Sequence, residues 1–317
     1  MGEPGDTGTD PAAGPGGGEW DSVLDHVACL RGKPRTVEVL TGGLTNVNLK
    51  VGYPGGTMVV RVAQPGSELL AIDRAAEHLN SRAAAQAGVG APVLDYVADP
   101  GLLVVGYIDG RTFTDEDLRK GGHLPRVAAA CRQLHGGPRF VNDFTMFQIQ
   151  RGYLDLVTRE GFRLPDRYLE FMPEVGRIER AFLAHPAATV PCNNDLLAGN
   201  FIDDGRKIWL IDYEYSGNND PCFELGNIWS EANLSLEQLE ELIEAYDGRL
   251  LRSRVARARL WGLMSKYGWT LWGSIQASVS SIDFDFWGWA MEKYDRAVAE
   301  FDGPGFGRLL DQAAADG

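Results

Sequence analysis

One stretch of this chain, residues 191–215, constrains its fold and chemistry more than any other. It reads PCNNDLLAGNFIDDGRKIWLIDYEY, in which Asp195 and Asn200 form a D-x-x-x-x-N pattern and an apolar run starting at Ile208 leads to Asp212. Phosphoryl transfer needs a carboxylate that orients a hydroxyl and takes its proton, and an amide oxygen and second carboxylate that hold Mg²⁺. The pattern therefore predicts Asp195 as a catalytic base, and Asn200 and Asp212 as metal ligands joined by a short hairpin.

Each of these three residues is also typical of an ordinary turn or strand end, because Asp and Asn side chains bond to nearby backbone groups. Their combination around one strand-turn-strand, with a Gly-rich hairpin far upstream, favours the catalytic interpretation.

Composition excludes several other classes of function. The chain has 317 residues, 44% of them hydrophobic, which is enough for a large core in one domain or two lobes. A net charge of −14 argues against nucleic acid and anionic membrane surfaces as partners, and would attract a cationic substrate. No apolar run approaches the roughly 20 residues that span a bilayer, and the N-terminus lacks the blocks of a signal peptide. We therefore expect no membrane insertion.

The cysteines and histidines argue against a zinc site, a disulfide framework and hydrolase chemistry. The four cysteines are scattered without C-x-x-C spacing, as expected for reduced thiols in the cytoplasm. The five histidines show no ligand spacing, and no Ser-His-Asp or Cys-His set emerges. His135, at the end of an amphipathic pattern, is expected to be packed or to cap a helix.

The order of patterns along the chain predicts two lobes of different class. After a disordered tail (residues 1–18), alternating apolar residues around the GGLTN and PGG turns predict strands, and an Ala-rich stretch predicts one long helix; together they form an N-terminal lobe over residues 19–108. Residues 109–317 are expected to be mostly helical. The expected class is therefore α+β, with a small β-rich lobe and a larger helical lobe.

Two segments favour a nucleotide site in the cleft. The GGLTN turn, which ends with Thr45 and Asn46, would let backbone N–H groups approach phosphate oxygens, although glycines in a hairpin are more often simply a turn. Tyr107 and Ile108 follow a strand and precede a break at Gly110, which fits a hinge whose backbone could hold an adenine ring.

Arg61 interrupts the apolar strand MVVRVA. A charge inside such a strand is costly unless it is paired, and Glu77 in the following helix could pair with it and leave the guanidinium for nucleotide phosphates. The alternative is that Arg61 lies on an edge strand and faces water.

Six of the eight tryptophans lie between Trp229 and Trp289. Trp269 and Trp272 share one face of an expected helix. Such a stripe is more often core, but an aromatic box also binds a quaternary ammonium, which cannot donate a hydrogen bond. Trp287 and Trp289 cannot share one helical face, so one of them is expected only to pack.

These segments resemble the choline and ethanolamine kinases, in the wider fold group of aminoglycoside phosphotransferases and protein kinases. The resemblance extends from about Val37 to Tyr294 and rests on GGLTN, VVRV with Glu77, NDLLAGN, IDYEYSGNNDPCFELGN and WTLWGSIQASVSSIDFDF. It implies a two-lobed protein-kinase-like fold with ATP and Mg²⁺ in the cleft. It also implies the roles of site residues: Asp195 as base, Asn200 and Asp212 on Mg²⁺, Arg61 on the phosphates, Glu77 positioning Arg61, and Glu231 with Trp269, Trp272 and Trp289 around the substrate ammonium.

Two positions depart from the family pattern. Asn193 stands where the family has His, and Glu224 stands where Asp is usual. For Asn193 we expect altered packing with activity kept, whereas the extra methylene of Glu224 leaves the geometry of that supporting carboxylate open.

The expected function is ATP-dependent phosphorylation of the hydroxyl of a small cationic amino alcohol, choline or ethanolamine, by a cytoplasmic kinase. Two alternatives stay open: an aminoglycoside-type antibiotic phosphotransferase, and a catalytically inactive ligand-binding pseudokinase. The family's dimers make a homodimer one candidate oligomeric state, which the sequence does not show.

Overall fold

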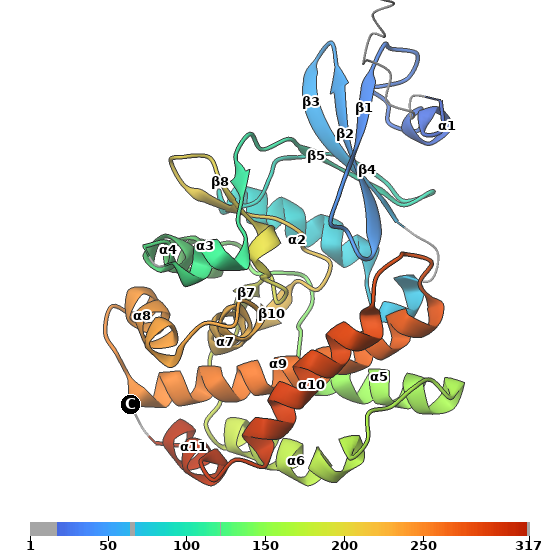
Figure 1. Cartoon of the computed structure of the whole chain (residues 1–317). Coiled ribbons are helices and arrows are strands. Elements are labelled where there is room, and N and C mark those ends of the chain that lie inside the picture. Colours follow the sequence, from blue (N-terminus) through green and yellow to red (C-terminus); the bar gives the residue numbers. More distant parts are fainter. Residues whose placement is uncertain (1–17, 64–66, 121, 316–317) are drawn as a thin grey trace, which may run out of the picture.

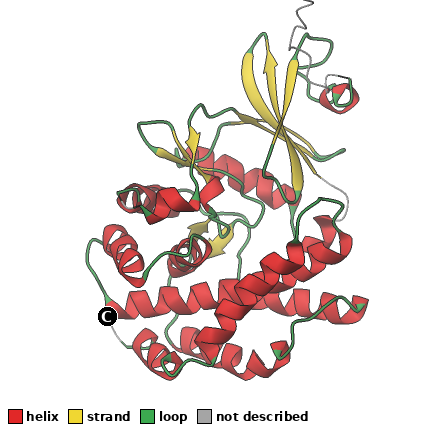
Figure 2. Ribbon diagram, viewed as in Figure 1, coloured by secondary structure: helices red, strands yellow, loops and turns green. Residues whose placement is uncertain are grey.

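The computed structural model describes residues 18–63, 67–120 and 122–315. Its N-terminal part is built around one β-sheet and its C-terminal part around helices (Figures 1 and 2). The expected α+β class is therefore confirmed. The expected disordered tail, residues 1–18, lies outside the described residues except for Gly18.

The N-terminal part is a five-stranded antiparallel sheet with one long helix beside it (Figure 1). Its strands are β1 (Thr36–Leu40), β2 (Asn46–Tyr53), β3 (Gly56–Ala63), β4 (Val93–Val97) and β5 (Leu102–Gly106), in the order β1-β2-β3-β5-β4. The helix α2 (Arg74–Gln86) begins at Asp73, whose carboxylate accepts the N–H groups of Ala75 and Ala76 at 3.0 Å. A short helix α1 (Asp21–Leu24) packs on the sheet through Leu24.

Two small sheets lie between the N-terminal sheet and the helices. One pairs β7 (Val190–Cys192) with β10 (Gly217–Asn219), and the other contains β6 (Arg111–Thr112), β8 (Phe201–Asp203) and β9 (Ile208–Leu210) in the order β6-β8-β9. The β8-β9 hairpin separates Asn200 from Asp212, as the sequence predicted. These strands hold the predicted catalytic segment in place.

The helical part packs around one long helix. The remaining elements are α3 (Asp115–Arg119), α4 (Leu124–His135), α5 (Met146–Glu160), α6 (Met172–Ala184), α7 (Pro221–Glu231), α8 (Leu236–Asp247), α9 (Arg252–Val279), α10 (Phe286–Phe301) and α11 (Phe306–Ala313), with short 3₁₀ turns at Ser67–Leu70, Tyr168–Phe171 and Ala198–Asn200. Helices α5, α7, α10 and α11 all contact α9 (Figure 1), whose residues 255–258 and 260–276 are buried. None of the described helices combines the length and the apolar character needed to cross a bilayer.

Two glycines allow α7 and α9 to cross closely. A Cβ added at Gly226 would lie 2.0 Å from the carbonyl oxygen of Ala258, and one added at Gly262 would lie 2.7 Å from the carbonyl oxygen of Gly226. Because α7 also bears Glu224 and Glu231, this crossing fixes the position of both carboxylates relative to α9.

Gly226→Ala is therefore expected to lower the free energy of unfolding by ~3 kcal/mol or more, since backbone would have to move. Gly152 in α5 is a matched control, because nothing lies within 4 Å of an added Cβ there. Gly152→Ala is expected to stabilise the protein by ~0.5–1 kcal/mol through helix propensity. Urea denaturation measures both, and equal effects of the two substitutions would contradict the close crossing.

Candidate active site

A cavity of about 590 Å³ lies between the five-stranded sheet and the β6-β8-β9 sheet. Its wall includes the predicted residues Arg61, Tyr107, Ile108, Asn200 and Asp212. Volumes of this size are typical of sites for cofactors and small molecules. The structure thus brings the expected hinge, the strand arginine and both expected metal ligands to one space.

The turn between β1 and β2 meets this cavity through its glycines rather than through the polar residues singled out from the sequence. Thr41, Gly42 and Gly43 line the cavity. Gly42 has φ +100°, a conformation that side-chain-bearing residues rarely adopt. The predicted Thr45 and Asn46 are not among the cavity's lining residues.

Thr45 and Asn46 instead fasten the turn to charged groups behind it. Thr45 Oγ1 donates to the Glu214 carboxylate, and Asn46 Oδ1 accepts from Arg74 Nη2 at 2.9 Å. Arg74 also pairs with Glu214 at 2.8 Å. These contacts are available because Glu214 is buried and needs donors.

Arg61 is buried and lies between two carboxylates. It pairs with Glu77 of α2, and its Nη1 lies 2.5 Å from Asp212 Oδ1. The alternative of a water-facing edge strand is excluded, because β3 lies between β2 and β5 and Arg61 is 8% exposed. One guanidinium therefore connects the sheet, α2 and the segment that follows β9.

The backbone before Asp195 is held by one buried carboxylate, Glu224 of α7. Glu224 accepts the N–H groups of Asn193 at 3.1 Å and Asn194 at 2.7 Å. Asn194 has a left-handed backbone with φ +69°, and its side chain donates to the carbonyl oxygen of Tyr215 at 3.0 Å. The extra methylene of Glu224, a departure noted in the sequence, is compatible with two good hydrogen bonds.

The second departure, Asn193, also makes specific contacts. Its side-chain N–H₂ group donates to the carbonyl oxygens of Ile211 at 3.1 Å and Asp212 at 2.7 Å. Asp212 itself has φ +63°. Asn193 therefore connects the backbone beside Asp195 directly to the backbone that presents Asp212.

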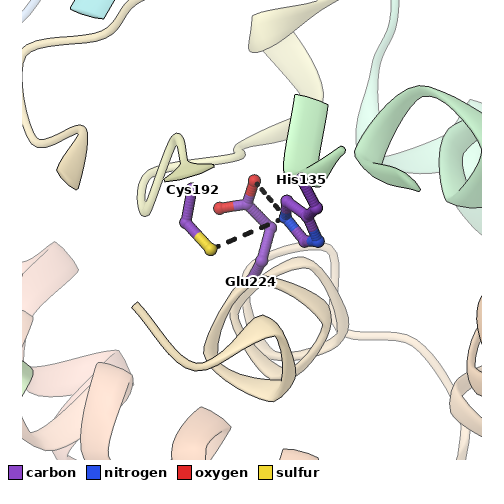
Figure 3. A group of neighbouring side chains, drawn as sticks. All are labelled: His135, Cys192 and Glu224. Atoms are coloured by element: carbon purple, nitrogen blue, oxygen red, sulfur yellow. Dashed lines mark hydrogen bonds and ion pairs between the residues drawn. The ribbon is translucent and has the colours of Figure 1, made fainter. Parts of the chain in front are cut away.

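Figure 3 shows His135 and Cys192 beside Glu224. His135 Nε2 lies 3.4 Å from Glu224 Oε1 and 3.6 Å from Cys192 Sγ, and its Nδ1 is hydrogen-bonded to the Tyr246 hydroxyl at 2.7 Å. His135 is buried at the end of α4, as the sequence predicted. Burial raises the pKa of the Cys192 thiol, and both Glu224 oxygens already accept N–H groups. Hydrogen bonding explains why these three residues lie together.

Asp195, Asn200 and Asp212 lie close together, as the spacing predicted. Asn200 Nδ2 donates to the carbonyl oxygen of Asp195 at 2.7 Å. Burial raises the pKa of Asp195 well above its usual range, and the carboxylates of Asp212 and Glu231 raise it further. Burial also raises the pKa of Asp212, against the opposing effect of Arg61.

The donor set at this point suits a hard divalent cation. The side-chain N–H₂ group of Asn200 donates to the backbone carbonyl of Asp195, which leaves the side-chain oxygen of Asn200 to act as a ligand. Asn200 and Asp212 both line the cavity. Amide and carboxylate oxygens are the ligands that Mg²⁺ prefers.

Sequence reasoning missed Glu214. Burial alone would raise its pKa, but Arg61 and Arg74 outweigh that effect and lower it. It lies two residues after Asp212, and this second acid in the DYEY segment was the available signal. Its partners, however, lie on β3, on α2 and in the β1-β2 turn.

Two of the three predicted acceptor-site tryptophans contact Tyr215, and the third contacts one of these two. The Trp269 ring packs on Tyr215 with centroids 4.8 Å apart, and Trp272 Nε1 donates to the Tyr215 hydroxyl at 2.9 Å. Trp272 also meets Trp289 edge to face at 5.2 Å. Burial raises the pKa of Tyr215 well above its usual range, and the charges of Glu214 and Asp195 raise it further. Trp287 instead lies against the Arg163 guanidinium.

Glu231, predicted to lie near the substrate ammonium, forms an ion pair within the protein. Its partner is Lys293 of α10, another residue that sequence reasoning missed. Both side chains are buried, and a buried carboxylate is stable only with a counter-charge.

Comparisons with known proteins agree with this geometry. Residues 36–261 match the model of a phosphotransferase enzyme family. The crystal structure of a choline/ethanolamine kinase family protein from Mesorhizobium loti superposes with a TM-score of 0.82 and 33% identity, covering 93% of this chain and 98% of that one. Protein LicA of Haemophilus influenzae is 31% identical, over 65% of this chain and 61% of its own length. A probable ethanolamine kinase of Arabidopsis thaliana is 26% identical, over 82% of this chain and 78% of its own length.

The raised pKa of Asp195 predicts that ligand-free protein gains stability when this charge is removed. The ordinary pKa of an Asp carboxyl is 3.8, and the pKa of Asp195 in the folded protein is higher. Such a group contributes its full stability at pH values below the ordinary pKa. This contribution is lost as the pH rises through the pKa of the folded protein. At pH 7.5 without divalent cations, Asp195→Asn should raise Tm by ~2 °C or more, and by less at pH 5. Asp203, whose pKa Arg126 lowers, is the opposite control: Asp203→Asn should lower Tm. Thermal denaturation that shows the same sign for both variants would contradict the assignment.

Glu224→Gln is expected to lower the free energy of unfolding by ~1–3 kcal/mol, because one amide oxygen replaces two carboxylate oxygens that accept backbone N–H groups. Glu241 is an exposed glutamate of the neighbouring α8, and Glu241→Gln should change stability by less than ~0.5 kcal/mol. Urea denaturation followed by circular dichroism distinguishes the two, and an unchanged midpoint for Glu224→Gln would remove its anchoring role.

Proposed function

Because this chain belongs to the phosphotransferase enzyme family and is a small-molecule kinase with a hydroxyl acceptor, we propose that it transfers the γ-phosphoryl group of ATP to a small cationic amino alcohol, choline or ethanolamine. One observation supports this most directly. The backbone carbonyl of Asp195 is bonded to the side chain of Asn200, which lines the nucleotide-sized cavity together with Asp212, and Lys293 already places an ammonium group over the Trp289 ring.

The nucleotide is proposed to bind in the 590 Å³ cavity. The backbone at Tyr107 and Ile108 would hold the adenine, and the glycines at 42 and 43 would admit the phosphates close to the backbone. Arg61, oriented by Glu77, would face the phosphate charge. Thr45 and Asn46 are proposed to act indirectly, by holding the turn on Glu214 and Arg74.

Asp195 is proposed to orient the acceptor hydroxyl and to accept its proton as the oxygen attacks phosphorus. The raised pKa of Asp195 makes its carboxylate a stronger base. The same shift lowers the fraction of Asp195 that is ionised at a given pH in the ligand-free protein. Asn200 and Asp212 would hold Mg²⁺, which when bound neutralises phosphate charge. Asn193 and Glu224 keep Asp195 and Asp212 in register through their backbone contacts.

The acceptor's ammonium is proposed to lie against the rings of Trp269, Trp272 and Trp289, near Glu231. Aromatic rings attract cations that cannot donate hydrogen bonds, by ~0.5–2 kcal/mol each. Trp272 is fixed by its bond to Tyr215, so its ring would be held in place before the acceptor arrives.

The two alternatives have less support. An aminoglycoside site needs several carboxylates for a polycation, whereas this region presents rings and a Glu231 that is already neutralised by Lys293. The pseudokinase alternative rested on Asn193 and Glu224, and both make hydrogen bonds that hold the loop.

Two further properties are proposed from the sequence. The four cysteines, all within the described residues, are free thiols, which supports a cytoplasmic location. A homodimer is proposed only by analogy with the family.

The decisive measurement is ADP release over a panel of choline, ethanolamine, a neutral alcohol and kanamycin. We expect turnover with an amino alcohol, and a kcat at least ~10³-fold lower for Asp195→Asn with nucleotide affinity nearly unchanged. Asp203→Asn changes a carboxylate of the same hairpin that pairs with Arg126 and does not line the cavity, so it serves as the matched control and should keep wild-type kcat. Turnover by Asp195→Asn, or of kanamycin alone, would refute the proposal.

A further inference from the structure

Lys293 lies where a cationic ligand would be expected to bind. Its Nζ pairs with Glu231 and also lies 4.2 Å from the centroid of the Trp289 ring. The side chain is 4% exposed. A carboxylate and an aromatic face are the two groups that recognise an ammonium ion, and the protein's own lysine occupies both.

The charges at this position act on Asp195, the predicted base. Glu231 and Lys293 are both among the charges that alter the pKa of Asp195, with opposite signs. Trp289 contacts Trp272, which bonds to Tyr215. The charges at this position therefore act on the predicted base, and its aromatic contacts lead to Tyr215.

The Glu231 carboxylate is only partly used. Its Oε1 is buried and has no hydrogen-bond partner among the described residues, and the same holds for Trp269 Nε1. Glu231 Oε1 can therefore accept a hydrogen bond or a counter-charge that the described residues do not supply.

A second lysine makes a similar arrangement with other partners. Lys266 of α9 pairs with Glu300, whose Oε2 also has no partner among the described residues, and lies 5.1 Å from the Trp229 ring. It is similarly buried, but its ion-pair partner is Glu300 and not Glu231. Lys266 therefore provides a control for the general effect of removing a buried lysine.

We propose that Lys293 is an internal competitor for the acceptor's cation site: the acceptor's ammonium binds by replacing Lys293 Nζ on the Trp289 ring and the Glu231 carboxylate. This rests on the proposed function. Two cations within about 4 Å of each other repel strongly at low dielectric, so they cannot share the ring and the carboxylate. Lys293 thereby sets the affinity for cationic acceptors and leaves that for neutral alcohols unchanged.

The charges that surround this site fit such an exchange. Glu231 contributes to it from α7 and Lys293 from α10, while Arg296 donates to the carbonyl oxygen of Ser230 one residue away. Burial lowers the pKa of Lys266 on α9, and the charges of Glu300 and Glu231 oppose that effect. With Lys293 in place, Glu231 is neutralised. Once Lys293 moves away, the incoming ammonium supplies the counter-charge, so the buried Glu231 carboxylate stays paired with a cation throughout.

The test compares Lys293→Met, Lys293→Arg and Lys266→Met, with choline and its neutral carbon analogue 3,3-dimethylbutan-1-ol as acceptors. Lys293→Met should lower KM for choline by ~10-fold and leave KM, or the inhibition constant, of the neutral analogue within ~2-fold. Lys293→Arg, which can hold Glu231 with two hydrogen bonds, should raise KM for choline. Lys266→Met should leave the ratio of the two KM values unchanged.

A purely structural Lys293 gives the opposite pattern. Lys293→Met would then impair both acceptors equally and Lys293→Arg would resemble wild type, and either result overturns the proposal. If Lys293→Met does not fold, the direction of the Lys293→Arg effect on choline decides.

A binding measurement separates this proposal from the proposed function. Calorimetric titration with tetramethylammonium chloride needs no turnover, and tighter binding by Lys293→Met than by wild type supports the competition. Equal or weaker binding refutes it. Absence of ADP release by wild type with every amino alcohol would refute the proposed function instead.

Discussion

The structure depends on a buried arrangement of charges that joins the N-terminal sheet to the helical part. Arg61 lies between Glu77 and Asp212, and Arg74 lies between Glu77 and Glu214. Each of these charges would be costly to bury alone, so the two parts of the chain are stable in the relative position that pairs them. Two guanidinium groups face three carboxylates, and the remaining negative charge at the cavity wall favours a bound cation.

The same principle explains how the segment around Asp195 keeps its shape despite two departures from the family pattern. Asn194 and Asp212 both have positive φ angles, which are unfavourable for residues with side chains. Glu224 and Asn193 supply hydrogen bonds to the backbone at these two points. The interactions needed to hold the loop are therefore present, although different residue types make them.

The aromatic region shows how one set of contacts can serve both stability and recognition. Trp269 and Trp272 are 4% and 6% exposed, so they are core residues by burial, and both contact Tyr215. Lys293 places an ammonium group over the neighbouring Trp289 ring. In the proposed exchange, an acceptor's ammonium would replace this group beside Glu231, a carboxylate that is already buried and paired in the folded protein.

The sequence by itself determined the order of strands and helices, and hence the α+β class, because residue alternation and helical periodicity are local properties. It also determined that Asp195, Asn200 and Asp212 lie together, since a hairpin of two three-residue strands returns the chain to its starting point. Their roles, and those of the other predicted site residues, stay predictions. Only the tertiary structure decided that Thr45 bonds to Glu214, 169 positions away, and that Lys293 neutralises Glu231, 62 positions away. A buried charge takes whichever partner the packing of distant elements brings within reach, and no local pattern specifies that partner.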